Sequence, residues 1–316
     1  MGRIIDIDAG RLLIASDLHG NWEDYQKIKN VFKSLRDKGK ADALILDGDL
    51  VHGYPGYEDK SVEILDDLID NPDSRVISML GNHELMHIYH LGKNVKNVHD
   101  FAGPLEKKIE GNRARYVDFM KSMPYAVRTA GGVLINHTGA NVPMAADLPV
   151  SDYPHHPSEQ LSGKTDGFEL VDSLDHDAVL AALGVVMEAQ SGQRLPDDFS
   201  HKYSPQIGQT FNETAIGNYL LEVFFNKNED QYKDGVYERM LTIFMRKMSK
   251  GGSQQRFLVS GHIEVPDGYR VVGGKQLRIS SSHGAEDSKK VLASVDASRQ
   301  YSSVGELVKD LIPVYP

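Results

Sequence analysis

The feature that most constrains this chain is a buried-strand pattern that ends in polar residues, at positions 12–21. Residues 12–16 are mostly apolar, Asp17 and His19 follow two positions apart, and Gly20 permits a sharp backbone turn. Asn21 is a favoured N-cap for a helix in which apolar residues recur at helical spacing. In open α/β sheets, ligands bind in the crevice at the carboxyl ends of strands. An oxygen and a nitrogen donor in that crevice suit a metal ion.

The same order, an apolar strand followed by polar residues beside a glycine, occurs four more times. The polar residues that follow these strands are Asp49, Asn82, His83, Glu84, His137 and His262. The chain has no cysteine, so thiolate sites and disulfides are excluded and any metal must be held by oxygen or nitrogen. Such a donor set suits two divalent ions such as Mn, Fe or Zn, with one carboxylate bridging them.

Composition restricts the partners and the expected location. A formal net charge of -10 argues against general nucleic-acid binding and against binding to a membrane surface. No apolar run approaches the roughly 18 residues that a transmembrane helix needs. The first residues contain no apolar segment typical of a secretory signal. We therefore expect a cytoplasmic protein, and 40% hydrophobic residues allow a substantial core.

The order of the predicted elements favours one domain over 1–316 with an insertion at about 139–250. Helices are expected near 22–39, 58–71 and 104–122, between the strands that carry the polar residues. A long Pro- and Gly-punctuated loop over 139–168 and three helices near 169–190, 212–227 and 236–249 then interrupt the strand series. After the last polar strand, stretches near 269–280 and 290–296 are predicted to be a hairpin-like pair of strands. A short amphipathic helix beginning at Val304 follows them.

Five blocks of sequence together resemble the calcineurin-like metallophosphoesterases. These blocks are Asp17-Leu18-His19, Gly48-Asp49, Gly81-Asn82-His83-Glu84, the strand-borne His137 and Gly261-His262. The third block, and the absence of a second histidine after the fifth, resemble the phosphoprotein (Ser/Thr) phosphatase branch. The resemblance implies an α/β fold, a four-layer αββα sandwich of two mixed sheets flanked by helices.

The resemblance also implies a role for each residue in these blocks. The first metal ion would be held by Asp17, His19 and Asp49, and the second by Asp49, Asn82, His137 and His262, with Asp49 bridging. His83 would not be a ligand but a catalytic residue beside the substrate, either a general acid or an oxyanion stabiliser. A metal-bridging hydroxide would attack phosphorus in line, and the leaving oxygen would need a proton.

One block departs from the family pattern. Protein phosphatases usually continue Gly-Asp-x-Val with Asp-Arg-Gly, in which the acid orients the catalytic histidine and the arginine clamps phosphate. Here Gly48-Asp49-Leu50-Val51 continues with His52-Gly53-Tyr54. Glu84 or another carboxylate is then expected to support His83. Arg113, Arg115 and Arg128 are candidates for the clamp, and the sequence leaves the choice among them open.

Several further histidines have two interpretations each. His52 is either a substrate contact or a solvated loop residue, and His283 follows a strand where the family brings a loop over the active site. His87, His90 and His99 lie on or near the helix after His83 and are predicted to be surface residues. Together with Glu84 and Arg128, His52 and His283 form the set of candidate substrate-binding residues.

The resulting hypothesis is a dinuclear-metal phosphomonoesterase of the protein Ser/Thr phosphatase type, acting on a phosphoprotein or a small phosphoester. An alternative is a nucleotide hydrolase resembling the bis(nucleosyl) tetraphosphatases, which also lack the orienting acid, or a phosphodiesterase. A non-catalytic scaffold is a third interpretation. The presence of all six ligand positions together with His83 argues against it, because degenerate relatives usually lose ligands.

Overall fold

The computed structural model describes residues 3–91, 102–141, 143, 171–191, 210–211, 213–225, 228–233, 235–249 and 253–316. They form two mixed β-sheets. The six-stranded sheet has the order β1 (Ile4–Ile7), β5 (Ala126–Thr129), β6 (Val133–Ile135), β7 (Phe257–Ser260), β9 (Gln276–Ile279) and β8 (Tyr269–Val272). The five-stranded sheet has the order β11 (Ile312–Pro313), β10 (Val291–Asp296), β2 (Arg11–Ser16), β3 (Ala43–Asp47) and β4 (Val76–Ser78).

The two sheets pack face to face because their strands alternate apolar residues between two cores. In β2, Leu12 and Ile14 point into the core between the sheets, while Leu13 and Ala15 point to the outer face. The inner core also takes side chains from both sheets, among them Ile45, Val127, Val133, Ile135, Val259, Leu277, Ile279, Ala293 and Val295. Each sheet is therefore buried on both faces, and each needs helices on its outer side.

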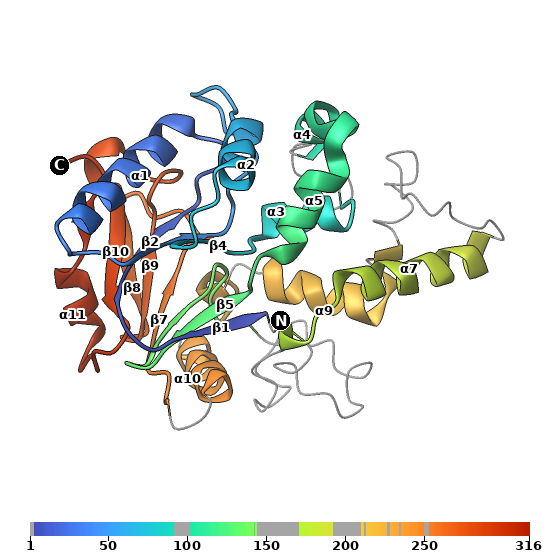
Figure 1. Ribbon diagram of the computed structural model, residues 1–316. Helices are drawn as coiled ribbons and strands as arrows, with labels where there is room; N and C mark the ends of the chain where they lie inside the picture. Colours follow the sequence, from blue (N-terminus) through green and yellow to red (C-terminus); the bar gives the residue numbers. More distant parts are fainter. Residues whose placement is uncertain are drawn as a thin grey trace.

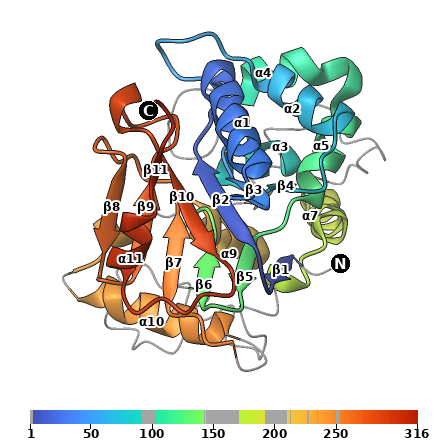
Figure 2. The ribbon, with the colours of Figure 1, turned by 60° about the vertical axis from the view of Figure 1, so that its left-hand side comes forward.

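Helices supply those outer layers. Figure 1 shows α1 (Trp22–Asp37) and α2 (Ser61–Asp70) on one side of the sandwich and α10 (Val236–Met248) on the opposite side. Figure 2 shows α11 (Val304–Lys309) near β8, β9 and β10, and its Val304 and Leu307 join the inner core. The remaining described helices are α3 (Asn82–Ile88), α4 (Ala102–Ile109), α5 (Arg113–Ser122), α7 (His176–Ser191), α9 (Ala215–Phe224) and the 3-10 turns η1 (Glu110–Asn112), η5 (Asn228–Gln231) and η6 (Asp287–Lys289). The predicted αββα sandwich is confirmed.

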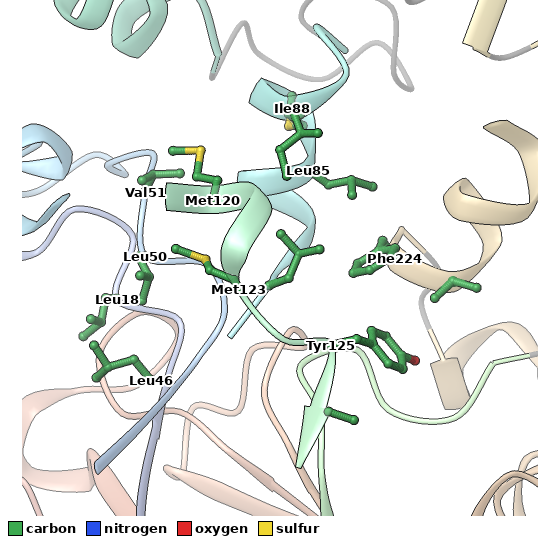
Figure 3. Packing of buried hydrophobic residues seen from close by; sticks show 14 of the residues in the cluster. Leu18, Leu46, Leu50, Val51, Leu85, Ile88, Met120, Met123, Tyr125 and Phe224 are labelled. Atoms are coloured by element: carbon green, nitrogen blue, oxygen red, sulfur yellow. The ribbon is translucent and has the colours of Figure 1, made fainter. Parts of the chain in front are cut away.

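An apolar layer beside the sandwich fixes the loop after β3 against α3. Leu50 and Val51 of that loop, Leu85 and Ile88 of α3, and Met120 of α5 belong to one buried cluster (Figure 3). All five side chains are fully buried. Because buried apolar contacts strongly resist displacement, the loop and α3 hold a fixed relative position.

The end of the chain differs from the prediction of a simple hairpin-like pair. Gly273 and Gly274, with φ of 55° and 63°, form a tight turn that splits the 269–280 stretch into β8 and β9. β10 then crosses to the other sheet and pairs antiparallel with β2, because its alternate apolar residues complete the inner core there. Strands β1 and β5 were not predicted. Each is only four residues long, and polar Asp6 or Arg128 interrupts its apolar pattern.

The strand order brings distant parts of the sequence to one end of the sandwich. β2, β3 and β4 are parallel neighbours, and β6 and β7 are parallel neighbours in the other sheet. Their carboxyl ends lead into all the predicted ligands.

The interpretation of the chain as one domain with an insertion at about 139–250 stays a prediction, and most of the 139–168 loop and His99 lie outside the described residues. No helix among the described residues is long and apolar enough to cross a membrane.

Candidate active site

Backbone conformation marks the predicted ligand positions. Asp17, His19, Asp49 and His262 have φ of 56°, 47°, 52° and 72°, in the left-handed region that L-residues other than glycine rarely adopt. His52 shares this conformation, with φ of 73°. Strained backbone of this kind costs about 1–3 kcal/mol per residue and concentrates at functional sites. Strands β2, β3 and β7 therefore each end in a left-handed turn that presents a polar side chain to the site.

Glycines let these turns approach one another. A Cβ on Gly81 would lie 2.3 Å from Asp49 Oδ1, and a Cβ on Gly261 would lie 2.3 Å from Asp17 Oδ2. A Cβ on Gly48 would lie 2.7 Å from the His137 ring. Only glycine fits at such distances, so the glycines before Asp49, Asn82 and His262 are required for these close approaches.

Two groups of potential metal-ligating atoms share the Asp49 carboxylate. His19, Asp49 and His83 form one group, and Asp49, His137 and His262 form the other; within each, the ligand atoms lie within 4.8 Å of one another. Asp49 Oδ2 is 3.0 Å from His137 Nε2 and 3.8 Å from His19 Nε2. Asp17 Oδ1 also lies 3.8 Å from His19 Nε2. The shared carboxylate is in the position expected of a bridging ligand.

Backbone carbonyls orient two of the imidazoles. His137 Nδ1 hydrogen-bonds the carbonyl oxygen of Asp47 at 2.7 Å, and His19 Nδ1 hydrogen-bonds that of Val51 at 3.2 Å. Because a carbonyl only accepts, Nδ1 carries the proton in each ring and Nε2 faces Asp49. Metal-ligating histidines are held in this way in most metalloproteins.

The Asn82 amide supports the same conclusion. Its terminal atom nearest the site lies 2.8 Å from His262 Nδ1, 3.2 Å from His137 Nε2 and 3.1 Å from Asp49 Oδ2. An amide nitrogen at this position would donate to these atoms. An amide oxygen would complete a ring of acceptors, which is the environment that a divalent cation prefers. The donor set therefore fits a metal centre.

Protonation in the site also suits cation binding. Burial opposes ionisation of Asp49, but His137 and His83 outweigh it and hold the pKa of Asp49 well below its usual value. Burial lowers the pKa of His19 well below its usual value, which keeps this imidazole neutral. Burial also acts to lower the pKa of His137, yet Asp49 raises it to about 10. A cation bound there would displace that proton.

Comparison with known proteins agrees with this geometry. A family model described as calcineurin-like phosphoesterase matches residues 10–227. The chain belongs to the calcineurin-like phosphoesterase family. No curated protein sequence matches it.

Solved structures share the fold of this phosphoesterase at low identity. The cold-active protein-tyrosine phosphatase of a psychrophilic Shewanella species has a TM-score of 0.52 and 15% identity, covering 94% of this chain and 78% of that one. A protein serine/threonine phosphatase from Saccharomyces cerevisiae, with similarity to human phosphatase PP5, has a TM-score of 0.51 and 14% identity, covering 98% of this chain and 82% of that one. At these identities the likeness shows the fold alone.

A line of hydrogen-bonded side chains extends from His83 away from the ligands. His83 Nδ1 lies 2.7 Å from His52 Nδ1, and His52 Nε2 lies 2.6 Å from His87 Nε2. His87 Nδ1 lies 2.7 Å from Glu106 Oε1, and Arg113 Nε donates to Glu106 Oε2 at 2.9 Å. His52 is therefore neither a solvated loop residue nor a direct phosphate contact, because both its ring nitrogens are taken up by histidines.

Glu84 takes a different part from the predicted one. Its two carboxylate oxygens accept hydrogen bonds from the backbone N–H groups of Asp49 (3.0 Å), Leu50 (2.7 Å) and Gly81 (3.0 Å). These bonds fasten the turn after β3 to the start of α3. Glu84 thus supports the backbone that presents Asp49, rather than His83 or a substrate.

The three candidate clamp arginines already have carboxylate partners. Arg128 lies on the outer face of β5 and forms a bidentate pair with Asp6 of β1, at 2.7 and 2.9 Å. Arg115 pairs with Asp66, and Arg113 with Glu106. We therefore leave Arg128 out of the substrate site, because strand alternation turns it away from the core between the sheets.

His283 lies beside the ligands, as expected of a loop that follows β9. Its backbone N–H donates to the carbonyl of Asp17 at 3.0 Å, and its ring stacks on Tyr54 with centroids 3.7 Å apart. The His19 ring lies edge-on to both, at 4.8 Å from Tyr54 and 5.1 Å from His283. His283 Nε2 hydrogen-bonds Glu264 at 3.0 Å. These two rings form an aromatic border next to His19.

Four important residues escaped the sequence prediction. His87 and His90 are buried, not surface residues, and His87 follows His83 by four positions, a helical spacing that places both on one face of α3. That spacing was a readable signal. The sequence contains no comparable signal for Glu106, because only the packing of α4 on α3 brings it to His87. Arg278, buried on β9, donates to the carbonyl of Gly261 at 2.6 Å and to Glu229, and it braces the turn before His262.

The ionised state of Glu106 predicts a pH-dependent stability difference. Burial opposes ionisation, but hydrogen bonds from His87 and Arg113 outweigh it and lower the pKa of Glu106 to about 2. Because the folded pKa lies below the unfolded one, this stabilisation is present above about pH 4.5 and disappears as pH falls towards 2. Glu106→Gln should therefore lower the free energy of unfolding by up to about 3 kcal/mol at pH 7.

Urea denaturation of both proteins between pH 7 and pH 3 tests this, and the difference should shrink as the pH falls. Asp66→Asn is the control, because it breaks the more exposed pair with Arg115 in a neighbouring part of the helical layer. That change should cost about 0–1 kcal/mol. A difference for Glu106→Gln that stays constant with pH would contradict the assignment.

Proposed function

We propose that this phosphoesterase is a phosphomonoesterase of the protein Ser/Thr phosphatase type that uses two divalent cations. The observation that carries the proposal is the Asp49 carboxylate shared by two groups of ligand atoms. Asp17 and His19 would complete one site, with His83, the third member of that group, kept as the catalytic residue. Asn82, His137 and His262 would complete the other. Phosphatases of protein substrates among the proteins with this fold support the choice of a phosphorylated substrate.

Bound divalent cations would supply an activated water and neutralise charge on the phosphate. The residues of the chain itself would do the rest. Asp49 would hold both cations, and the carbonyl-oriented imidazoles of His19 and His137 would present Nε2 to them. His83, whose Nε2 lies 3.9 Å from Asp49 Oδ2 and so beside the ligand groups, would exchange a proton with the leaving oxygen. Manganese is the metal that we propose to test first.

A nucleotide hydrolase or phosphodiesterase is the second candidate. The observation in its favour is that Arg113, Arg115 and Arg128 all form ion pairs with carboxylates of the chain. A phosphoprotein phosphatase that clamps the phosphate with one of these three arginines would need that arginine to be available. A substrate that the protein binds through its nucleotide part would not depend on that arginine clamp.

Hydrolysis of matched esters separates the two candidates. Metal-stripped protein receives Mn, and its turnover of an aryl phosphomonoester is compared with that of the corresponding diester. We expect metal-dependent hydrolysis of the monoester, with little of the diester. Preference for the diester would favour the second candidate. Absence of hydrolysis with both metals bound would favour a non-catalytic role.

Asp49→Asn should remove most activity and weaken metal binding, because an amide bridges two cations less well than a carboxylate. We expect a loss of at least about 100-fold in kcat/KM, in the range typical of damaged metal centres. Titration calorimetry with Mn gives the affinity, and the monoester assay gives the rate. Near wild-type turnover with full metal content in this variant would overturn the dinuclear assignment.

His83→Ala should keep both metals and lose rate mainly with poor leaving groups, by about 100-fold or more, as expected when a general acid is removed. Nitrophenyl phosphate, whose leaving group needs little protonation, should be affected much less. Metal analysis of the purified variant is the control. If the variant instead loses a metal, His83 is a ligand and its assigned role is wrong.

A further inference from the structure

We propose that Glu106, His87 and His52 form a positioning relay that fixes the ring orientation and tautomer of His83. The inference rests on the proposed function, because it assigns His83 the proton exchange with the leaving oxygen. The sequence lacks the acid that would orient this histidine directly from position 52. In the structure, a carboxylate two rings away is connected to it by hydrogen bonds.

The relay is closed to water over its length. His87 is fully buried, and the exposed fractions of His52, His83 and Glu106 are 2%, 8% and 8%. Its three links measure 2.6 to 2.7 Å between heavy atoms. Hydrogen bonds in such surroundings do not compete with solvent, and each one polarises the next.

The carboxylate end of the relay suggests a position for each proton. An ionised carboxylate only accepts, so His87 donates its Nδ1–H to Glu106. In the proposed relay, His87 Nε2 accepts from His52 Nε2–H, and His52 Nδ1 in turn accepts from His83 Nδ1–H. The second nitrogen of His83, Nε2, is thereby the one turned towards Asp49, 3.9 Å away. To protonate a leaving oxygen, this nitrogen would carry a second proton, and the ring would be an imidazolium whose Nδ1–H stays bonded to His52.

The relay is anchored at Glu106 and at His52. Arg113 donates to both oxygens of Glu106, which holds the carboxylate in place and ionised. Burial, with the neighbouring His87 and His83, lowers the pKa of His52 well below its usual value, and this ring stays neutral. The His52 backbone N–H donates to Ser61 Oγ at 2.9 Å, so the loop cannot turn the ring away without breaking that bond.

The fold explains why three separate elements can build this line. His83 and His87 are spaced by one helical turn on α3, and His52 lies in the loop packed against that helix. Glu106 on α4 and Arg113 at the start of α5 approach from the far side. An acid at position 52 would contact His83 directly, whereas in this arrangement the carboxylate comes from the helical layer outside the sandwich.

Double-mutant kinetics test the relay. In protein loaded with Mn, Glu106→Gln should lower kcat for an alkyl phosphomonoester by about 10-fold, a part of what a general acid contributes. It should change kcat for nitrophenyl phosphate by less than about 2-fold. In a His83→Ala background the same substitution should cause no further loss, because residues that act as one unit are non-additive.

His87→Gln is the second relay variant and should behave like Glu106→Gln. His176→Gln is its matched control, because His176 is an equally buried histidine whose Nδ1 bonds Tyr89 OH at 2.7 Å, outside the relay. The control should leave the ratio of the two rates unchanged, even if it lowers stability. Equal losses on both substrates, or additive losses with His83→Ala, would show that the relay residues are merely structural.

A measurement without turnover makes the relay testable by itself. Ring 15N–1H correlation spectra of zinc-loaded, histidine-labelled protein report which nitrogen of each imidazole carries the proton. We expect His83 protonated on Nδ1 in the wild type and a mixture of tautomers in Glu106→Gln. An unchanged His83 tautomer in that variant would overturn the relay. If the wild type hydrolyses neither ester, the proposed function fails, and these spectra alone decide whether the relay exists.

Discussion

The buried Asp49 carboxylate is the interaction on which the rest of the site depends. It contacts histidines from both sheets, and its negative charge is tolerated in the core only because cationic or hydrogen-bonding partners surround it. Its backbone is held in a strained conformation by the Glu84 carboxylate and by the close approach of Gly81. The energy needed for that conformation comes from the packing of the two sheets and of α3, so the fold and the site cannot be separated.

The candidate ligands could be located from the sequence because their positions obey a local rule. Each follows an apolar strand and a turn, and parallel strands bring their carboxyl ends to one edge. The αββα arrangement came from the same five blocks through their resemblance to a family. A prediction of this kind can place only those residues whose position is determined by the strand that precedes them.

The residues that were misread depend on tertiary packing. His87 was taken for a surface residue because α3 is short, and its covering by α4 and α5 cannot be read from α3 itself, although the spacing from His83 was visible. Arg128 was a plausible phosphate clamp by type, yet one register position in β5 turns it outward to Asp6. β10 was assigned to a neighbouring strand, although its partner β2 lies near the other end of the sequence. Strand pairings between such distant segments depend on the burial of complementary apolar faces, and no short stretch of sequence contains that information.

The pairing of β6 with β7 has a consequence for how the molecule assembles. Val133 and Phe257 lie side by side although about 120 residues separate them, whereas β2 and β3 are joined by one helix. The entropy lost on closing a loop grows only slowly with its length, but long-range pairing slows folding. The half of the site carrying Asp17 and Asp49 can therefore form early, from a local strand–helix–strand unit. The half carrying His137 and His262 must wait for the two distant strands to meet, so a nascent chain acquires its two ligand groups at different times.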